Sequence, residues 1–161
     1  MYDLTQFLEL FNPLPGNCYL EVSVTPDEIT QALYDMLDSV DGNLSLALYN
    51  DDKKTDFLDA KVENIDDLKK PFRAIPRNYD IVVFKDIFHK HQNQKMILKI
   101  AYTALANTAD IIIMEKKGIL DLDKVKEKLE NFEFRAANDI DIVDGYDLIM
   151  AKKMHMWGNG L

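Results

Sequence analysis

Titratable side chains stand at the ends of three segments that resemble buried strands, where they could do chemistry. Glu21 lies near the end of the first segment, Asp51 follows the second, and His89 follows the third. Open α/β sheets bind ligands beyond the carboxyl ends of their strands. A carboxylate there could hold an amine or a ribose diol, and an imidazole, which titrates near neutral pH, could act as a base. Each residue also has a purely structural interpretation: Glu21 faces solvent at a strand end or pairs with a Lys or Arg, Asp51 lies in a solvated turn, and His89 is exposed where a helix begins.

Other reactive residues support fewer kinds of chemistry. Lys85 and Asp86 could line the same crevice or neutralise each other. His89 and His91 have no cysteine or third ligand beside them, so we predict no metal site and expect both imidazoles to be exposed. Cys18 is the single cysteine, which excludes an internal disulfide and points to a reducing compartment. It has no nearby His or cation to activate it, so we expect a small residue that is buried or half-buried.

The acidic residues are concentrated in the first third of the chain. The 161 residues include 19 Lys plus Arg and 28 Asp plus Glu, for a net charge of −9, and residues 1–52 contain no Lys or Arg. A phosphate backbone requires cations, so we expect no nucleic-acid partner, whereas a basic protein partner or a small cationic ligand suits this segment. No basic start precedes an apolar run, and no apolar stretch approaches the roughly 20 residues of a membrane span. We therefore expect a cytoplasmic protein with no membrane contact.

Hydrophobic periodicity predicts alternating strands and helices. Thr25 and Pro26 open a helix that runs to Val40, with Thr25 as its cap and Glu28 completing a capping box. The other predicted helices cover residues 4–11, 65–72, 92–106 and a segment capped by Asp121, and the predicted strands cover 19–24, 44–49, 57–62, 79–84, 110–114, 135–143 and 146–154. Alternation of this kind predicts a mostly parallel sheet covered on both faces. Asp144-Gly145 predicts a hairpin between the last two strands.

Two segments carry a resemblance to a known family. Residues 79–91, Tyr-Asp-Ile-Val-Val-Phe-Lys-Asp-Ile-Phe-His-Lys-His, resemble the fourth-strand motif of class I S-adenosylmethionine-dependent methyltransferases, and residues 104–115 resemble the helix end and fifth strand that follow it. The resemblance implies an α/β fold of the three-layer, Rossmann-like methyltransferase type, with a mostly parallel sheet and a C-terminal antiparallel hairpin. It implies one domain over residues 1–161: an N-terminal helix and loop (1–17), a Rossmann-like core (18–155) and a tail (156–161). The hairpin and the tail, with Trp157, suit a homodimer interface.

The sequence departs from the family where the cofactor is expected to bind. The family's first strand ends in an acid followed by a glycine-rich loop, whereas Glu21 here is followed by a stretch with no glycine before Gly42. Glycine permits a positive φ and close approach of a ligand to the backbone. Val24 is β-branched and Pro26 has a fixed φ, so this turn is not expected to follow the glycine loop's path. The cofactor-binding residues that the resemblance implies are Glu21, Ser23, Thr25, Asn50, Asp51, Asn64, Lys85 and Asp86.

The charges in the first turn of the helix predicted to run to Val40 distinguish between the candidate cofactors. Asp27 and Glu28 would repel the pyrophosphate that NAD or FAD places at a helix start, and no P-loop for ATP is present. S-adenosylmethionine carries a sulfonium and an ammonium against one carboxylate, so an acidic rim tolerates it. The implied cofactor is therefore S-adenosylmethionine, without NAD, FAD, ATP or a metal.

Two functions remain open at this point. The first is a methyltransferase that acts on a small molecule or a protein, with His89 as its catalytic base. The second is an inactive methyltransferase-fold module that binds a basic protein partner or a small cationic ligand. The missing glycines favour the second function, whereas Glu21 and the fourth-strand motif support the first, and fold alone does not decide between them.

Overall fold

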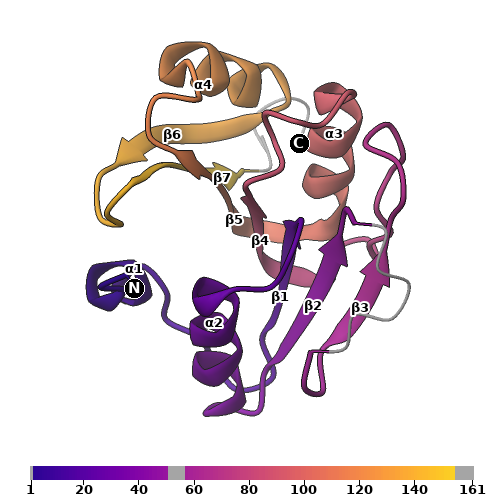
Figure 1. Ribbon diagram of the computed structural model, residues 1–161, viewed down its shortest axis with the longest axis vertical. Coiled ribbons are helices and arrows are strands. Elements are labelled where there is room, and N and C mark those ends of the chain that lie inside the picture. Colours follow the sequence, from indigo (N-terminus) through magenta and orange to yellow (C-terminus); the bar gives the residue numbers. More distant parts are fainter. Residues whose placement is uncertain (1, 51–56, 155–161) are drawn as a thin grey trace, which may run out of the picture.

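The chain forms a seven-stranded sheet flanked by helices. The computed structural model describes residues 2–50 and 57–154 (Figure 1). The helices are α1 (Thr5–Glu9), α2 (Glu28–Asp38), α3 (Gln94–Ala104) and α4 (Leu122–Asn131), and the strands are β1 (Cys18–Ser23), β2 (Asn43–Leu48), β3 (Lys61–Asn64), β4 (Tyr79–Lys85), β5 (Leu105–Lys116), β6 (Phe134–Ile140) and β7 (Tyr146–Lys153). None of the described helices is long and apolar enough to cross a membrane.

The sheet is mostly parallel, as predicted, and has the order β3-β2-β1-β4-β5-β7-β6. β1 lies between β2 and β4, with Val22 paired to Ala47 on one side and to Phe84 on the other. β7 runs antiparallel to both β5 and β6, which confirms the predicted hairpin. The strand order reverses between β1 and β4. In open α/β sheets this switch point is where ligands bind, at the carboxyl ends of the strands.

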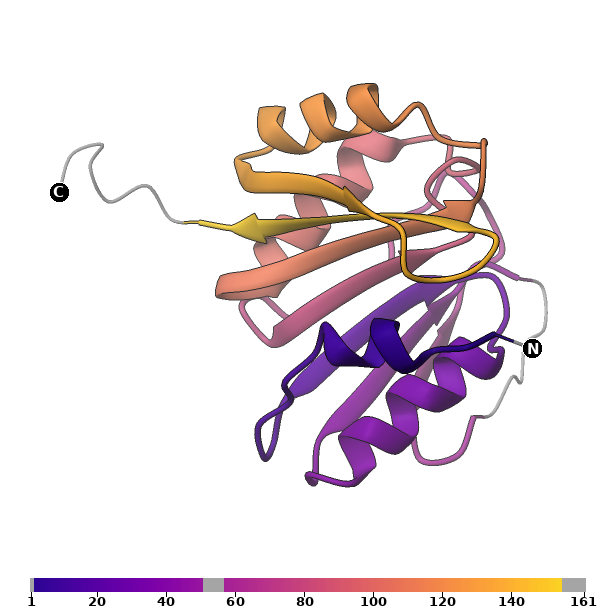
Figure 2. The ribbon, with the colours of Figure 1, turned by 90° about the vertical axis from the view of Figure 1, so that its left-hand side faces the viewer.

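Helices cover both faces of the sheet, which gives the predicted three layers. Phe7 of α1 and Leu33 of α2 pack with one set of buried residues, whereas Ile97 of α3 and Leu129 of α4 pack with the other. Figure 2 shows α1 and α2 in front of the sheet and α3 behind it. The two faces therefore have separate cores, and each core is held by its own pair of helices.

The cap of α2 differs from the prediction. Asp27, not Thr25, is the N-cap: its Oδ1 accepts hydrogen bonds from the backbone N–H groups of Ile29 and Thr30. The Thr30 hydroxyl accepts from the Asp27 N–H, which completes a capping box. Thr25 and Pro26 thus lie outside the helix. A carboxylate satisfies two orphan amides at once, and the Asp27-x-x-Thr30 spacing provides the reciprocal bond.

The predicted helix over 65–72 is wrong, because residues 65–78 contain no helix. Backbone groups of this segment bind other elements: the Ile65 N–H donates to Leu48, and the Leu68 carbonyl accepts from the Gln92 N–H. Pro71 and Pro76 have no N–H to continue a helix. The predicted strand over 57–62 is also displaced, since β3 begins only at Lys61. One face of β1 to β3 is therefore covered by an irregular segment instead of a helix.

Candidate functional site

A buried ion pair joins β1, β4 and α2 at the carboxyl edge of the sheet. The Lys85 and Glu21 side chains are 1% and 0% exposed, with Lys85 Nζ 3.3 Å from Glu21 Oε2. Lys85 Nζ also donates to Asp27 Oδ1 at 2.7 Å and to the Thr30 hydroxyl at 3.0 Å. An ammonium has three donors, and here each of them has an acceptor. We call Glu21, Ser23, Asp27, Thr30 and Lys85 the Glu21–Lys85 cluster.

The Glu21 carboxylate is held from several sides within this cluster. It accepts hydrogen bonds from the Ser23 hydroxyl at 2.8 Å and from the Thr30 hydroxyl at 2.9 and 2.8 Å. Burial raises the pKa of Glu21, while the Lys85 ammonium and the two hydroxyls oppose this shift. The interpretation in which Glu21 pairs with a Lys or Arg is confirmed. A ligand amine could reach this carboxylate only by displacing groups of the protein itself.

Two side-chain amides close the neighbouring part of the edge. Asn64, at the end of β3, donates through Nδ2 to Asn50 Oδ1 at 3.0 Å. Asn50 Nδ2 in turn donates to the carbonyl of Val24, in the connection between β1 and α2. These contacts tie the ends of β2 and β3 to that connection. The structure thus brings Asn50 and Asn64 together, as the resemblance implied, but they bind each other and the backbone.

Asp86 belongs to a second network on the same edge. Its Oδ2 accepts from the Tyr146 hydroxyl at 2.7 Å, and Lys116 Nζ donates to the hydroxyls of Tyr146 and Tyr2 at 3.0 and 2.9 Å. Burial and the adjacent Asp86 raise the pKa of Tyr146. Lys85 and Asp86 therefore do not neutralise each other, because each of them has other partners. The network connects the N-terminal segment to the ends of β4 and β5.

His89 lies where the prediction places it, after β4 at the carboxyl edge, and its side chain is exposed. Its backbone N–H donates to Glu115 Oε2 at 2.8 Å. Glu115 is buried, and this burial raises its pKa. His89 also borders a small pocket of about 140 Å³ with Gln94 and Lys128. Its role as a base remains a prediction.

His91 is buried, so the expectation of two exposed imidazoles is wrong for this residue. Its Nδ1 accepts from the Asn93 N–H at 2.8 Å, and its Nε2 lies 3.1 Å from the Lys70 carbonyl oxygen and 3.3 Å from the Tyr49 hydroxyl. An accepting Nδ1 requires the neutral ring with its proton on Nε2. Burial lowers the pKa of His91. The imidazole thus fastens the segment after β3 to the end of β2.

The buried His91 predicts a loss of stability in mild acid. The folded-state pKa lies below the unfolded value of about 6.5, so the folded protein binds fewer protons and its stability is complete above that pH. Stability is lost as the pH falls toward the folded-state pKa. Urea unfolding at about pH 7.5 and about pH 5 measures this loss, which we expect to be smaller in His91→Gln than in the wild type. An equal loss in both proteins would contradict it, and His89→Gln serves as the matched control.

The predicted site residues therefore divide into separate groups. Glu21, Ser23 and Lys85 share one cluster, whereas Thr25 is exposed beside it. Asp51, Trp157 and the predicted homodimer tail lie outside the described residues. The sequence analysis did not identify several participants, among them Thr30, Glu115 and Tyr146. The signals were a threonine at cap spacing, an acid that continues a buried apolar strand, and a tyrosine at the start of β7.

Two further features describe the chemistry available among residues 2–50 and 57–154. No group of three or more His, Cys, Asp or Glu side chains there could hold a metal ion. No buried side-chain nitrogen or oxygen in those ranges lacks a hydrogen-bond partner. A preformed polar site usually aims some unsatisfied group at its ligand. The described part of the carboxyl edge satisfies its buried polar groups internally.

Several solved structures with the same fold are methyltransferases. An S-adenosylmethionine-dependent methyltransferase from Aquifex aeolicus superimposes with a TM-score of 0.73 at 13% identity, covering 95% of this chain and 90% of its own. Phosphoethanolamine N-methyltransferase 2 from Haemonchus contortus, in complex with S-adenosylmethionine, gives a TM-score of 0.69 at 9% identity. The superposition covers 94% of this chain and 52% of that enzyme. A chain from the complex between the Haloferax volcanii Trm112 methyltransferase activator and a methyltransferase gives a TM-score of 0.70 at 10% identity. The superposition covers 93% of this chain and 88% of that one.

The similarity is one of fold. The chain spans about half the length of some solved structures of this fold: 51% of the CurJ carbon methyltransferase and 52% of the Haemonchus contortus enzyme. No protein-family model matches the sequence. No curated protein sequence matches it either.

Proposed function

We propose that this chain, which has the class I methyltransferase-like fold, acts as a binding protein and does not transfer methyl groups. One observation carries the proposal: the Lys85 ammonium lies against Glu21, Asp27 and Thr30. The acid that the resemblance assigns to the cofactor already has a cationic partner supplied by the protein. Residues that satisfy one another in this way do not fit S-adenosylmethionine.

Burial makes the displacement of Lys85 costly. A ligand cation would have to take the place of the Lys85 ammonium beside Glu21, which leaves this buried ammonium without one of its two anionic partners. Removing one partner of a buried pair typically costs about 3–5 kcal/mol. The ligand would also have to displace the Ser23 and Thr30 hydroxyls from the carboxylate. Such a ligand must therefore recover more free energy from its other contacts than an open site would demand.

The backbone near the β1–α2 connection offers a carboxylate or ribose little in return. The N–H groups of Ile29 and Thr30, which a helix start could present to an anion, donate to Asp27. The Val24 carbonyl accepts from Asn50. With no glycine in this connection, side chains also stand between the backbone and any ligand.

An active methyltransferase is the second candidate. Support comes from the solved structures of the same fold, one of them in complex with S-adenosylmethionine, and from the exposed His89 at the carboxyl edge. In that function Glu21, Asn50, Asn64 and Asp51 would hold the cofactor. It requires the Lys85 side chain to leave its three acceptors, which the proposal above excludes.

Ligand-dependent stability tests the proposal. A ligand present at 100 times its dissociation constant stabilises the folded state by about 2.7 kcal/mol. We expect no change in melting temperature with millimolar S-adenosylmethionine or S-adenosylhomocysteine, because neither can reach the Glu21 carboxylate. An active methyltransferase measured in parallel provides the positive control. A saturable rise in melting temperature with either compound would contradict the proposal and favour the second candidate.

The helix α2 offers one surface for a binding function. Asp35, Asp38 and Asp41 are exposed there, and residues 1–52 supply no cation to offset them. The complex with an activator among the similar structures supports a protein partner for this fold. We infer that the exposed face of α2 attracts a basic partner through charge, with an affinity that falls as salt rises.

Retention on immobilised poly-lysine measures this attraction. We expect Asp35→Asn/Asp38→Asn to elute at lower salt than the wild type, because the variant weakens the local negative field. The control Glu127→Gln/Glu130→Gln makes the same change in net charge on α4. It should elute at a salt concentration between those of the wild type and of Asp35→Asn/Asp38→Asn. Equal elution of the two variants would mean that only net charge matters.

A further inference from the structure

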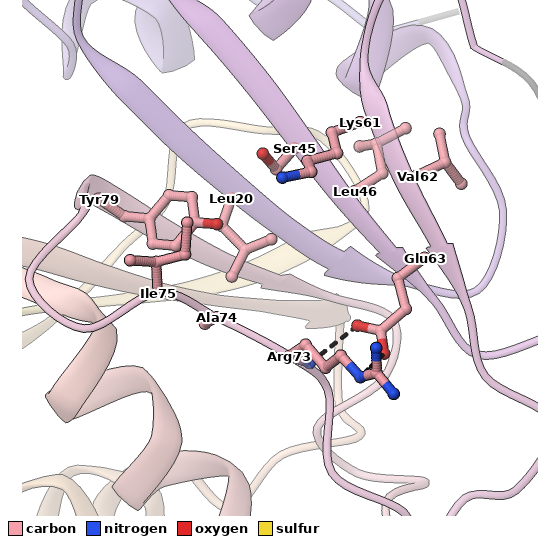
Figure 3. Close-up of a pocket in the computed structure, with 10 residues that line it drawn as sticks. All are labelled: Leu20, Ser45, Leu46, Lys61, Val62, Glu63, Arg73, Ala74, Ile75 and Tyr79. Carbon is pink, nitrogen blue, oxygen red and sulfur yellow. Dashed lines mark hydrogen bonds and ion pairs between the residues drawn. The ribbon is translucent and has the colours of Figure 1, made fainter.

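A groove lies on the face of the sheet opposite α2. It consists of two pockets that share Arg73 and Ala74: one of about 470 Å³ between residues of β1 to β4 and the segment Arg73–Ile75, and one of about 490 Å³ between Phe72–Ala74 and α3. Figure 3 shows Leu20, Ile75 and Tyr79 at one end of the first pocket and Glu63 with Arg73 at the other.

The groove exists because no helix covers this part of the sheet. The connection between β3 and β4 is irregular, and α3 and α4 pack with the other core residues of this face. Only Phe72 of the segment 72–75 is buried, while Ile75 is 55% exposed. The lining is therefore mostly apolar and partly open to solvent, so apolar side chains of a partner could pack against it.

Most charged side chains that line the groove are positive, although the whole chain has a negative net charge. Lys61, Arg73 and Lys99 line it and are exposed. Glu63 is the one acid among the described lining residues of the two pockets, and it is engaged by Arg73: its Oε1 accepts the Arg73 N–H at 2.8 Å, and its Oε2 lies 3.9 Å from Arg73 Nε. The pocket beside α3 has Arg73 and Lys99 and no acid among its described lining residues. A cationic rim around apolar walls thus interrupts the surface of a protein with a net charge of −9.

We propose that this groove, lined by Lys61, Arg73 and Lys99, docks an amphipathic segment of another protein that has apolar residues on one face and acidic residues beside them. The apolar walls would take the apolar side chains, and the three cations would pair with carboxylates at the rim. Two volumes near 500 Å³ fall in the range that accommodates several side chains. Charge complementarity selects an acidic segment over a basic one.

The same features disfavour two other occupants. The acidic face of a second copy carries the right charge, but that contact joins two different surfaces and would build a ring or a filament instead of the commoner two-fold dimer. A nucleic acid would meet apolar side chains such as Met96 and Ile100 where phosphates need cations. The proposal concerns a different face from the carboxyl edge, so it goes beyond the proposed function and stands whether or not S-adenosylmethionine binds.

Fluorescence anisotropy with a labelled helical peptide, Leu and Phe on one face and Glu on the other, tests the proposal. We expect saturable binding that weakens as salt rises. We also expect at least a tenfold weaker affinity for Arg73→Glu/Lys99→Glu, and an unchanged affinity for the control Lys90→Glu/Lys124→Glu. The four substituted residues of the two variants are all exposed lysines or arginines. Urea unfolding midpoints equal to that of the wild type will show that both variants fold.

Several results would overturn the proposal. One is an absence of binding, and another is an equal loss of affinity in both double variants, which would show that only net charge matters. A scrambled peptide of the same composition but without an apolar face should bind at least tenfold more weakly, and equal binding would remove the role of the apolar walls. Concentration-dependent self-association that Arg73→Glu/Lys99→Glu abolishes would assign the groove to a second copy.

Discussion

Lys85→Met is expected to lower the free energy of unfolding by about 3–5 kcal/mol, the usual cost of removing one partner from a buried ion pair. Methionine retains much of the length of lysine, so packing changes little and the effect is mostly electrostatic. The variant leaves the Glu21 carboxylate, which is 0% exposed, without a cation and leaves the Thr30 hydroxyl without one donor. Urea unfolding at neutral pH measures the change.

Two further variants attribute this loss to the ion pair. In Glu21→Gln/Lys85→Met both charges are absent, so we expect a substantial part of the lost stability to return. Lys90→Met changes an exposed lysine at the same edge and should stay within about 0.5 kcal/mol of the wild type. Additive losses for Glu21→Gln and Lys85→Met in a double-mutant cycle would show that the pair is not coupled.

The pH dependence of Lys85→Met gives an independent test. Without Lys85, burial raises the pKa of Glu21 further above its unfolded value of about 4.3, because only the Ser23 and Thr30 hydroxyls still oppose the shift. The contribution of Glu21 to stability is therefore complete in acid and is lost as the pH rises through the folded-state pKa. The deficit relative to the wild type should be larger at neutral pH than in mild acid. A deficit independent of pH would point to packing as its cause.

Phe7→Ala is expected to cost about 3–5 kcal/mol of stability, the range for emptying a buried aromatic site. Phe7 is 0% exposed, and its ring centroid lies 5.1 Å from that of Phe11 in an edge-to-face arrangement. Helix α1 has five residues and no side-chain cap, so its position depends on this packing. Calorimetric or urea-induced unfolding of the variant measures the loss.

The size of the Phe7 effect distinguishes an integral helix from a loose appendage. Phe7→Leu keeps most of the buried volume and should cost less than about 1.5 kcal/mol. Leu14→Ala removes a side chain that is 62% exposed and should change stability by less than about 0.5 kcal/mol. If Phe7→Ala behaved like Leu14→Ala, α1 would not be part of the core, and Tyr2 would not be held at the carboxyl edge through it.

Much of the fold was predictable, because its strands carry strong local signals. The runs that form β4 and the centre of β5 are continuous and β-branched, as expected for strands covered on both faces. The helix over 65–72 failed for a tertiary reason: the Lys70 carbonyl accepts from the Tyr49 hydroxyl, and Leu68 accepts from Gln92. Such contacts join distant parts of the chain, and local periodicity does not report them.

The sequence predicted where the residues of the candidate site lie, but not that Glu21 and Lys85 form an ion pair there. Glu21, Asn50, Asn64 and Lys85 lie at the carboxyl edge because strand ends in a parallel sheet meet there. The sequence does not show that Lys85 of β4 pairs with Glu21 of the neighbouring strand β1. The difference matters, because the same residues could bind a ligand when free and exclude it when paired.

A crystal structure of the protein grown with S-adenosylhomocysteine would show whether the Glu21–Lys85 cluster excludes the cofactor. We expect Lys85 Nζ within hydrogen-bonding distance of Glu21, Asp27 and Thr30, and no adenosyl density at the carboxyl edge. Density for the nucleoside resting against residues 23–27, with the lysine turned away from Glu21, would contradict it.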